Sequence, residues 1–151
     1  NDNPPEFLEE SYTAIVAENA EVNTEIVQVQ ARDRDFLDQG RLVYDLLEPS
    51  QFFAINNRTG TIFVSGVLDF ESRVGTTFRI IAIVRDSDAQ QAIANVNITV
   101  RDQNDLPPSI DTAPLTFNFT EGQFNLLPFP EIAISDSDTS QQLCNANVVL
   151  T

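Results

Sequence analysis

The chain lacks several residue types, and each absence removes a class of function. No histidine occurs among its 151 residues, which excludes a catalytic triad built on histidine. Cys144 is the single cysteine, so no internal disulfide can form, and we interpret it as a small core residue or as one member of a cut pair. No apolar run approaches the ~20 residues that a membrane-spanning helix needs.

Basic residues are also scarce. The chain has 8 lysines and arginines against 23 aspartates and glutamates, and its net charge is −15. Without a basic stripe it has no surface to meet phosphate, which argues against nucleic acids and anionic membranes as partners. An acidic composition can simply keep a protein soluble. Only the arrangement of the acids in the sequence can indicate whether they form ligand sites.

Several residues recur at a fixed offset along the chain. Asp2 and Asp105 lie 103 positions apart (105 − 2). The same offset relates Pro5 to Pro108, Glu18 to Glu121, Asp33 to Asp136, and Asp35 to Asp138. A fixed period indicates a tandem array of one structural unit. Because most of these positions carry carboxylates, the array repeats a charged site as well as a fold.

The offset also predicts the domain organisation. One period is long enough for a domain with its own core. We expect a linker from a preceding repeat at residues 1–5, a complete repeat at 6–101, an inter-repeat linker at 102–108, and the N-terminal part of a second repeat at 109–151. Paired prolines in both linkers stiffen the chain there.

Alternating apolar residues predict an all-β fold. The pattern has period two, with β-branched residues, in segments 27–31, 78–84 and 96–100. Such alternation is typical of half-buried antiparallel strands. Glycines, Pro49 and Asn56-Asn57 separate the segments, and about seven short strands fit into residues 10–101. We therefore expect a seven-stranded β-sandwich.

Closely spaced acids predict a calcium site. Asp33 and Asp35 are two residues apart, as are Asp69 and Glu71. Side chains at this spacing share one side of an extended chain, where two carboxylates repel each other unless a cation lies between them. Ca²⁺ takes about six to eight oxygen ligands from carboxylates, amides and backbone carbonyls. Crowded acids at the end of a sandwich suit this ion.

An ordered set of motifs resembles the cadherin repeat. The motifs are Ala17-Glu18-Asn19, Asp33-Arg34-Asp35, Phe53-Ala54-Ile55, Thr59-Gly60-Thr61-Ile62, Leu68-Asp69-Phe70-Glu71, Asp86, and Asp102-Gln103-Asn104-Asp105. The resemblance covers residues 1 to about 106 and, in part, the remainder, where the second repeat is more divergent. It implies a Greek-key sandwich of the cadherin and immunoglobulin-like type, with calcium ions at the junctions between successive repeats.

The resemblance also implies which residues would bind these ions. At the internal junction they are Glu18, Asp69 and Glu71 of the first repeat, Asn104, Asp105 and the backbone oxygens of Gln103 and Leu106 in the linker, and Asp136, Asp138 and the backbone oxygen of Asn145 in the second repeat. Leu106 stands where the family usually has asparagine, but a backbone oxygen is available from either residue. Asp102 is expected to orient the linker and not to bind the ion.

By the same resemblance, the sequence contains one half of an N-terminal junction, the residues of the linker and the lower repeat. Its residues are Asn1, Asp2, Asn3, Asp33, Asp35, Gln39 and Asp86, with Gln39 in place of a usual asparagine. The family places one ion on the linker and the lower repeat alone. The resemblance therefore implies that one ion can bind this chain at Asn1, Asn3, Asp33, Asp35, Gln39 and Asp86.

The function implied is that of a calcium-binding extracellular repeat that stiffens a tandem array in a cell-adhesion protein. The expected partners are calcium, other cadherin repeats of the same chain, and another cadherin in cis or trans; the parent is expected to be anchored in the plasma membrane. The chain has no tryptophan, the residue used by strand-swapping cadherins, so an adhesive tip of that kind is expected elsewhere. Three sequons, at Asn57, Asn97 and Asn118, are candidate glycan sites.

Two other classes of function remain as alternatives. One is a calcium-dependent carbohydrate- or matrix-binding β-sandwich of a secreted protein, which would use most of the same ligands. The other is an enzyme with Asp69 and Glu71 as a glycosidase-like pair. The lack of histidine and of a pocket-forming insertion argues against an enzyme.

Overall fold

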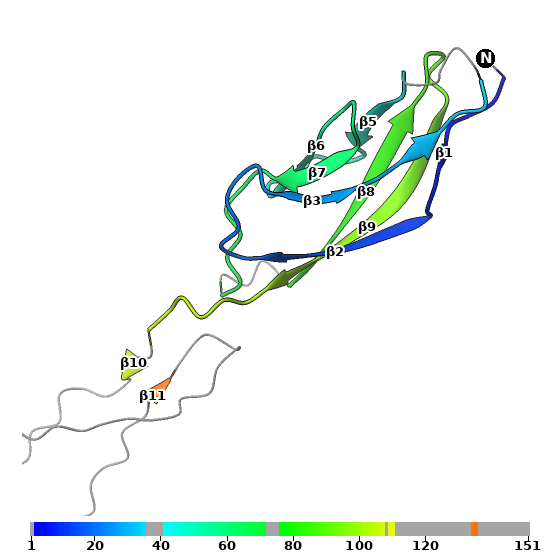
Figure 1. Cartoon of the computed structure of the whole chain (residues 1–151). Coiled ribbons are helices and arrows are strands. Elements are labelled where there is room, and N and C mark those ends of the chain that lie inside the picture. The colour runs from blue at the N-terminus through cyan, green and yellow to red at the C-terminus, as the bar shows by residue number, and fades with distance from the viewer. Residues whose placement is uncertain (1, 36–40, 72–75, 108, 111–133, 136–151) are drawn as a thin grey trace, which may run out of the picture. The chain divides into compact units, whose positions relative to one another are not determined.

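The computed structural model describes residues 2–35, 41–71, 76–107, 109–110 and 134–135 (Figure 1). The chain divides into two units, Asn1–Gln103 and Asn104–Thr151. The described residues are all-β and contain no helix, so none of them belongs to a helix that could cross a membrane. The predicted all-β class is thus confirmed.

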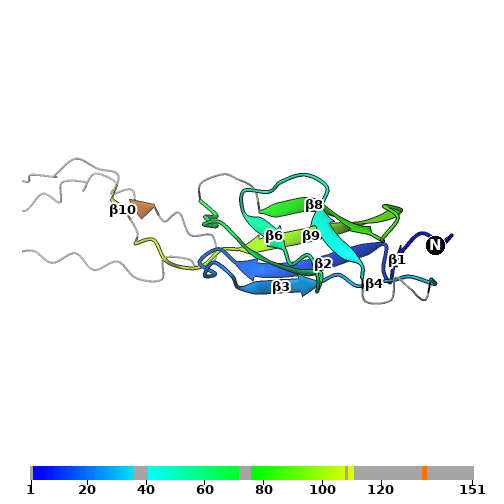
Figure 2. The same cartoon turned by 90° about the horizontal axis from the view of Figure 1, so that it is seen from above.

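Two sheets build the first unit (Figures 1 and 2). The four-stranded sheet has the order β2 (Ser11–Ala17), β9 (Gln91–Arg101), β8 (Thr77–Arg85) and β5 (Val43–Leu46). The three-stranded sheet has the order β3 (Glu25–Gln28), β7 (Thr61–Val64) and β6 (Phe53–Ile55). A short pair of strands, β1 (Glu6–Phe7) and β4 (Ala31–Arg32), forms a separate two-stranded sheet.

The core lies between these sheets and follows the alternation in the sequence. Val96, Ile98 and Val100 of β9 are buried, whereas the intervening side chains point outward. From the other sheet, Ile62 and Val64 of β7 are fully buried in the same cluster. Each such side chain contributes roughly 1.5–3 kcal/mol through burial. This apolar core fixes the loops at the two ends of the sandwich.

The pairing of β2 with β9 differs from the expected antiparallel arrangement. Antiparallel pairing holds between β8 and β9, between β5 and β8, and throughout the three-stranded sheet. However, β2 runs parallel to β9, with Ala17 opposite Arg101. Alternation reports which face of a strand is buried and carries no information on the direction of its neighbour. Parallel pairing makes both strands finish at the same end of the sandwich.

The predicted strand over residues 27–31 is interrupted. β3 ends at Gln28 and pairs with β7, and β4 begins at Ala31 and pairs with β1. Between them, the Tyr12 hydroxyl accepts a hydrogen bond from the Gln30 N–H at 3.2 Å and donates to the Gln30 carbonyl at 3.1 Å. The Tyr12 side chain thus takes the place of a backbone partner for the Gln30 N–H, whereas the Gln30 carbonyl also accepts the Leu8 N–H at 2.8 Å.

Only a small part of the second unit is described. β10 (Ser109–Ile110) and β11 (Ile134–Ser135) pair in antiparallel fashion, and the hydroxyl groups of Ser109 and Ser135 lie 2.9 Å apart. The description of residues 109–151 as the start of a second repeat stays a prediction. Several residues with predicted roles lie outside the described residues: Asn1, Gln39, Asn118, Asp136, Asp138, Cys144 and Asn145.

Candidate metal centres

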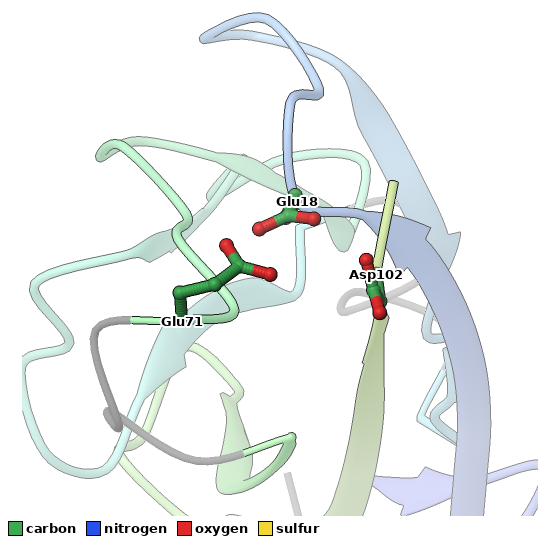
Figure 3. Close-up of side chains that lie close together, drawn as sticks. All are labelled: Glu18, Glu71 and Asp102. Atoms are coloured by element: carbon green, nitrogen blue, oxygen red, sulfur yellow. The ribbon is translucent and has the colours of Figure 1, made fainter. Parts of the chain in front are cut away.

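Three carboxylates meet at the end of the sandwich where β2 and β9 finish. One oxygen atom from each of Glu18, Glu71 and Asp102 lies within 4.8 Å of the others. Figure 3 shows the carboxylate groups of Glu18 and Glu71 facing each other, with Asp102 beside Glu18. Glu18 follows β2, Asp102 follows β9, and Glu71 lies in the loop before β8. β8 is antiparallel to β9, so this loop reaches the same end.

Glu18 is the central residue of this group and is only 3% exposed. Its backbone N–H donates to the Arg101 carbonyl at 3.0 Å, which continues the β2–β9 pairing by one residue. Its Oε2 atom accepts the Phe70 N–H and its Oε1 atom accepts the Gln103 N–H, both at 2.6 Å. Such charge-assisted bonds are worth about 1.5–3 kcal/mol each. Glu18 therefore holds the Asp69–Glu71 loop and the start of the linker in place.

The three carboxylates suit a hard divalent cation. Glu71 and Asp102 each bury one carboxylate oxygen completely, and Glu18 is buried as a whole. Two unit charges about 4 Å apart repel by about 4 kcal/mol at an effective dielectric constant of about 20. A divalent cation would turn this repulsion into attraction, and an all-oxygen ligand set is the one that Ca²⁺ prefers. The residues present thus fit a calcium ion.

Asp102 was missed as a ligand candidate by sequence reasoning. The resemblance implies that it orients the linker, whereas the structure places its carboxylate beside those of Glu18 and Glu71. The parallel register gives the reason: because Ala17 lies opposite Arg101, the next residues on the two strands are Glu18 and Asp102. Asp69, which was predicted, precedes Glu71 by two residues in the same loop but is not one of the three.

A second group of acids surrounds the start of the chain at the other end of the sandwich. The Oδ2 atom of Asp35 accepts the Asn3 N–H at 2.9 Å and the Asp2 N–H at 3.1 Å. The Asn3 side-chain amide donates to the other oxygen of Asp35 at 3.1 Å. These bonds, first of all those from Asn3, lower the pKa of Asp35 below its usual value of 3.8. The carboxylate is therefore ionised at neutral pH and fixes the linker on the repeat.

Asp33 and Asp86 are the buried acids of this end, 9% and 7% exposed. One oxygen of Asp33 accepts the Asp35 N–H at 2.8 Å, and the other is buried and accepts no hydrogen bond from the described residues. Asp86 directly follows β8 and accepts the Gln90 N–H at 2.8 Å. Val43 pairs with Arg85, so the start of β5 and the turn at Asp86 lie at the same end of the sheet. A buried carboxylate oxygen without a donor suits a cation.

The linker residues belong to the boundary between the two units. Gln103 is the last residue of the first unit and donates its N–H to Glu18. Asn104, Asp105 and Leu106 open the second unit and are exposed, Leu106 to 40%. Their predicted role in binding an ion together with the first unit stays a prediction.

An all-β repeat with a group of acids at each end is thus the class of protein that the fold and the sites define. The family description "Cadherin domain" matches residues 12–101. The chain therefore belongs to the cadherin family, as the sequence motifs predicted. Cadherin domains are extracellular, non-enzymatic adhesion domains that in general bind Ca²⁺.

Relatives and solved structures support this assignment. The chain is 36% identical to human Protocadherin Fat 1 over 72% of its length and 32% identical to Protein dachsous of Drosophila melanogaster over 99%. It spans only 2% and 4% of these two proteins. A solved structure of mouse Cadherin-23 EC22-24 superposes with a TM-score of 0.76 at 29% identity, covering 91% of this chain and 44% of that one.

Proposed function

We propose that this chain is a calcium-binding extracellular repeat that stiffens a tandem array in a membrane-anchored cell-adhesion protein. The observation that carries the proposal is the group formed by Glu18, Glu71 and Asp102, because a cation would stabilise three clustered carboxylates with buried oxygens. Membership in the cadherin family supports calcium as that cation. Other repeats of the same parent, and another cadherin in cis or trans, are the proposed partners.

The ligands at the linker end come from both repeats in this proposal. From the first repeat they are Glu18, Asp69, Glu71 and Asp102; from the linker, Gln103, Asn104, Asp105 and Leu106; and from the second repeat, Asp136, Asp138 and Asn145. An ion bound by both repeats restricts the angle between them. Without it the acids repel one another, and the linker is free to bend.

At the N-terminal end, one ion binds to the chain itself. Its ligands are Asn1, Asn3, Asp33, Asp35, Gln39 and Asp86, with Asp2 on the side of the preceding repeat. The hydrogen bonds from Asn3 to Asp35 hold the linker against the repeat before an ion binds. The buried Asp33 oxygen that accepts no hydrogen bond from the described residues would be stabilised by a cation. The ion thus completes an arrangement that the protein has already formed.

Thermal unfolding across a calcium titration tests the proposal. Sites in the weak extracellular range, roughly 10⁻⁴–10⁻³ M, predict a Tm that rises between about 0.1 and 10 mM Ca²⁺. Mg²⁺ should act far less, because it demands a tighter octahedral site. Asp33→Asn, which keeps the oxygen that accepts the Asp35 N–H, should reduce the rise. A Tm that does not respond to calcium in the wild type would overturn the proposed N-terminal site.

A further inference from the structure

The sequon Asn97-Ile98-Thr99 lies in β9, the strand between β2 and β8. Ile98 is fully buried in the core, so its two neighbours point to the opposite, outer face of the four-stranded sheet. Thr99 is exposed and Asn97 is half-buried there. The acceptor amide and the hydroxyl that define a sequon therefore lie on the same accessible face.

The outer face is hollowed beside Asn97. The strand register places Thr13 of β2 on one side of this residue and Arg79 of β8 on the other. A shallow depression of about 590 Å³ is lined by Ser11, Thr77, Arg79, Ile80, Ile81, Asn95 and Asn97. Within the described part of the chain, the Asn97 side chain makes no hydrogen bond, so its amide nitrogen is not held by the fold.

The lining of this depression suits a carbohydrate. Ser11, Thr77 and Asn95 offer hydroxyl and amide groups, which can donate to and accept from sugar hydroxyls. The Arg79 guanidinium offers up to five further donors and forms no ion pair with any described residue. Ile81 supplies an apolar surface for a sugar face. The depression thus combines polar groups with an apolar patch beside Asn97, the residue to which a glycan would be attached.

The sequon at Asn57 has a different setting. Asn57 lies in the turn between β6 and β7, where residues 56–59 are all exposed. Its carbonyl accepts the Tyr44 N–H at 2.9 Å, but its side chain is exposed and makes no hydrogen bond to the described residues. A glycan at Asn57 would extend from a loop into solvent, whereas one at Asn97 would lie over a sheet.

We infer that Asn97 carries an N-linked glycan whose first sugars rest in this depression and shield the outer face of the four-stranded sheet. In the attachment step the Asn97 amide nitrogen attacks C1 of a lipid-linked oligosaccharide diphosphate. The C1–N bond forms, the bond from C1 to the phosphate oxygen breaks, the lipid diphosphate leaves, and the amide loses one proton. This inference rests on the proposed extracellular location, because the glycan donor is found in the secretory pathway.

A glycan at this position has a consequence for adhesion. The outer face of β2, β9 and β8 would be covered, so a protein partner would have to dock on another surface of the repeat. The glycan would leave the acidic group at Asp102 uncovered, because the remainder of β9 up to Arg101 separates Asn97 from Asp102.

Site mapping on the chain secreted from mammalian cells tests the inference. A supplied signal sequence carries the chain into the secretory pathway, so the result does not depend on the proposed location or on calcium. Enzymatic deglycosylation in heavy-oxygen water followed by peptide mass mapping should mark Asn97. Asn97→Gln and Thr99→Ala should both abolish the mark, and Thr99→Ser, which preserves the sequon, should retain it. Secreted protein with unmodified Asn97 would overturn the inference.

A second measurement tests the place of the glycan on the surface. The glycosylated chain should melt at a higher Tm than the enzymatically deglycosylated chain. This difference should shrink in Arg79→Ala and stay unchanged in Arg58→Ala, a matched change at an exposed arginine in the Asn57 turn. Equal differences in the wild type and Arg79→Ala would show that the sugars do not rest on this face.

Discussion

At the scale of single residues, Glu18 shows how one side chain can serve both structure and function. Its two oxygens accept backbone N–H groups from Phe70 and Gln103, which belong to segments far apart in the sequence. These bonds fix the loop and the linker whether or not an ion is bound. The remaining lone pairs face the carboxylates of Glu71 and Asp102, where a cation would lie.

Replacing Glu18 with glutamine should destabilise the repeat even without calcium. The new amide group would place a donor against either the Phe70 or the Gln103 N–H, and the charge that strengthens both bonds would be lost. We expect a loss of about 2–3 kcal/mol in the free energy of unfolding, measured by urea denaturation with a chelator present. Glu21→Gln is the matched control at an exposed glutamate and should change stability by less than about 0.5 kcal/mol. Equal effects would refute the bridging role.

Gly60 is a position where only glycine fits. Its φ is +71°, and a Cβ atom built there would lie 2.2 Å from the Val29 carbonyl oxygen. Gly60→Ala should therefore cost more than the ~1 kcal/mol of the left-handed conformation alone, because the backbone of Val29 must also move. Arg58→Ala in the same turn serves as the control. Equal urea midpoints for the two variants would contradict this account.

At the scale of the elements, β9 organises the first unit. It pairs with β2 in parallel and with β8 in antiparallel fashion, and it alternates buried and outward-facing residues over its length. Its C-terminal end delivers Asp102 to the acidic group, and its outer face carries Asn97. The same strand thus connects the core, the candidate metal centre and the proposed glycan.

Truncation of a core side chain in β9 should be costly. Val96 is fully buried between the sheets, so Val96→Ala would lose apolar contacts and leave a cavity. We expect a loss of about 2–3 kcal/mol, read from the urea midpoint at an unchanged slope. Val67→Ala makes the same chemical change at a residue that is 80% exposed, and it should have almost no effect. A loss below about 0.5 kcal/mol at Val96 would contradict the assigned core.

At the scale of the whole molecule, the two acidic ends give the repeat its proposed role in an array. One end lies where β2 and β9 finish, and the other lies around the first residues of the chain. A repeat with a cation site at each end can be joined to a neighbour on both sides. In the proposed array, cations would offset the repulsion expected from the net charge of −15.

Calcium should protect the linker from proteolysis. In the proposed junction, an ion bound by ligands on both sides of the linker would keep the linker out of a protease active site. We expect cleavage after Asp105 by a protease specific for acidic residues to slow by at least ~10-fold, or ~1.4 kcal/mol of protection. Glu71→Gln should lose most of this protection, and Glu21→Gln should keep it. Equal cleavage rates with calcium and with a chelator would argue against the stiffening mechanism.

The sequence by itself determined the class of the fold and most of the candidate ligands. Apolar and polar residues alternate in segments such as 96–100 because the two faces of a strand meet different surroundings, so the pattern can be read from the sequence. The offset between Asp33 and Asp136 and the spacing of Asp69 and Glu71 can be read directly from the sequence, and both patterns predicted acidic sites. The match to the cadherin domain over residues 12–101 confirms the family that these motifs predicted.

Only the tertiary structure decided which acids lie together. The parallel pairing of β2 with β9 puts Asp102 beside Glu18, and no local pattern reports the direction of a neighbouring strand. At the break between β3 and β4, the Tyr12 hydroxyl likewise reaches Gln30 from another strand. Both features arise from contacts between residues distant in sequence, whereas alternation and motif spacing can be read along the chain without knowing those contacts.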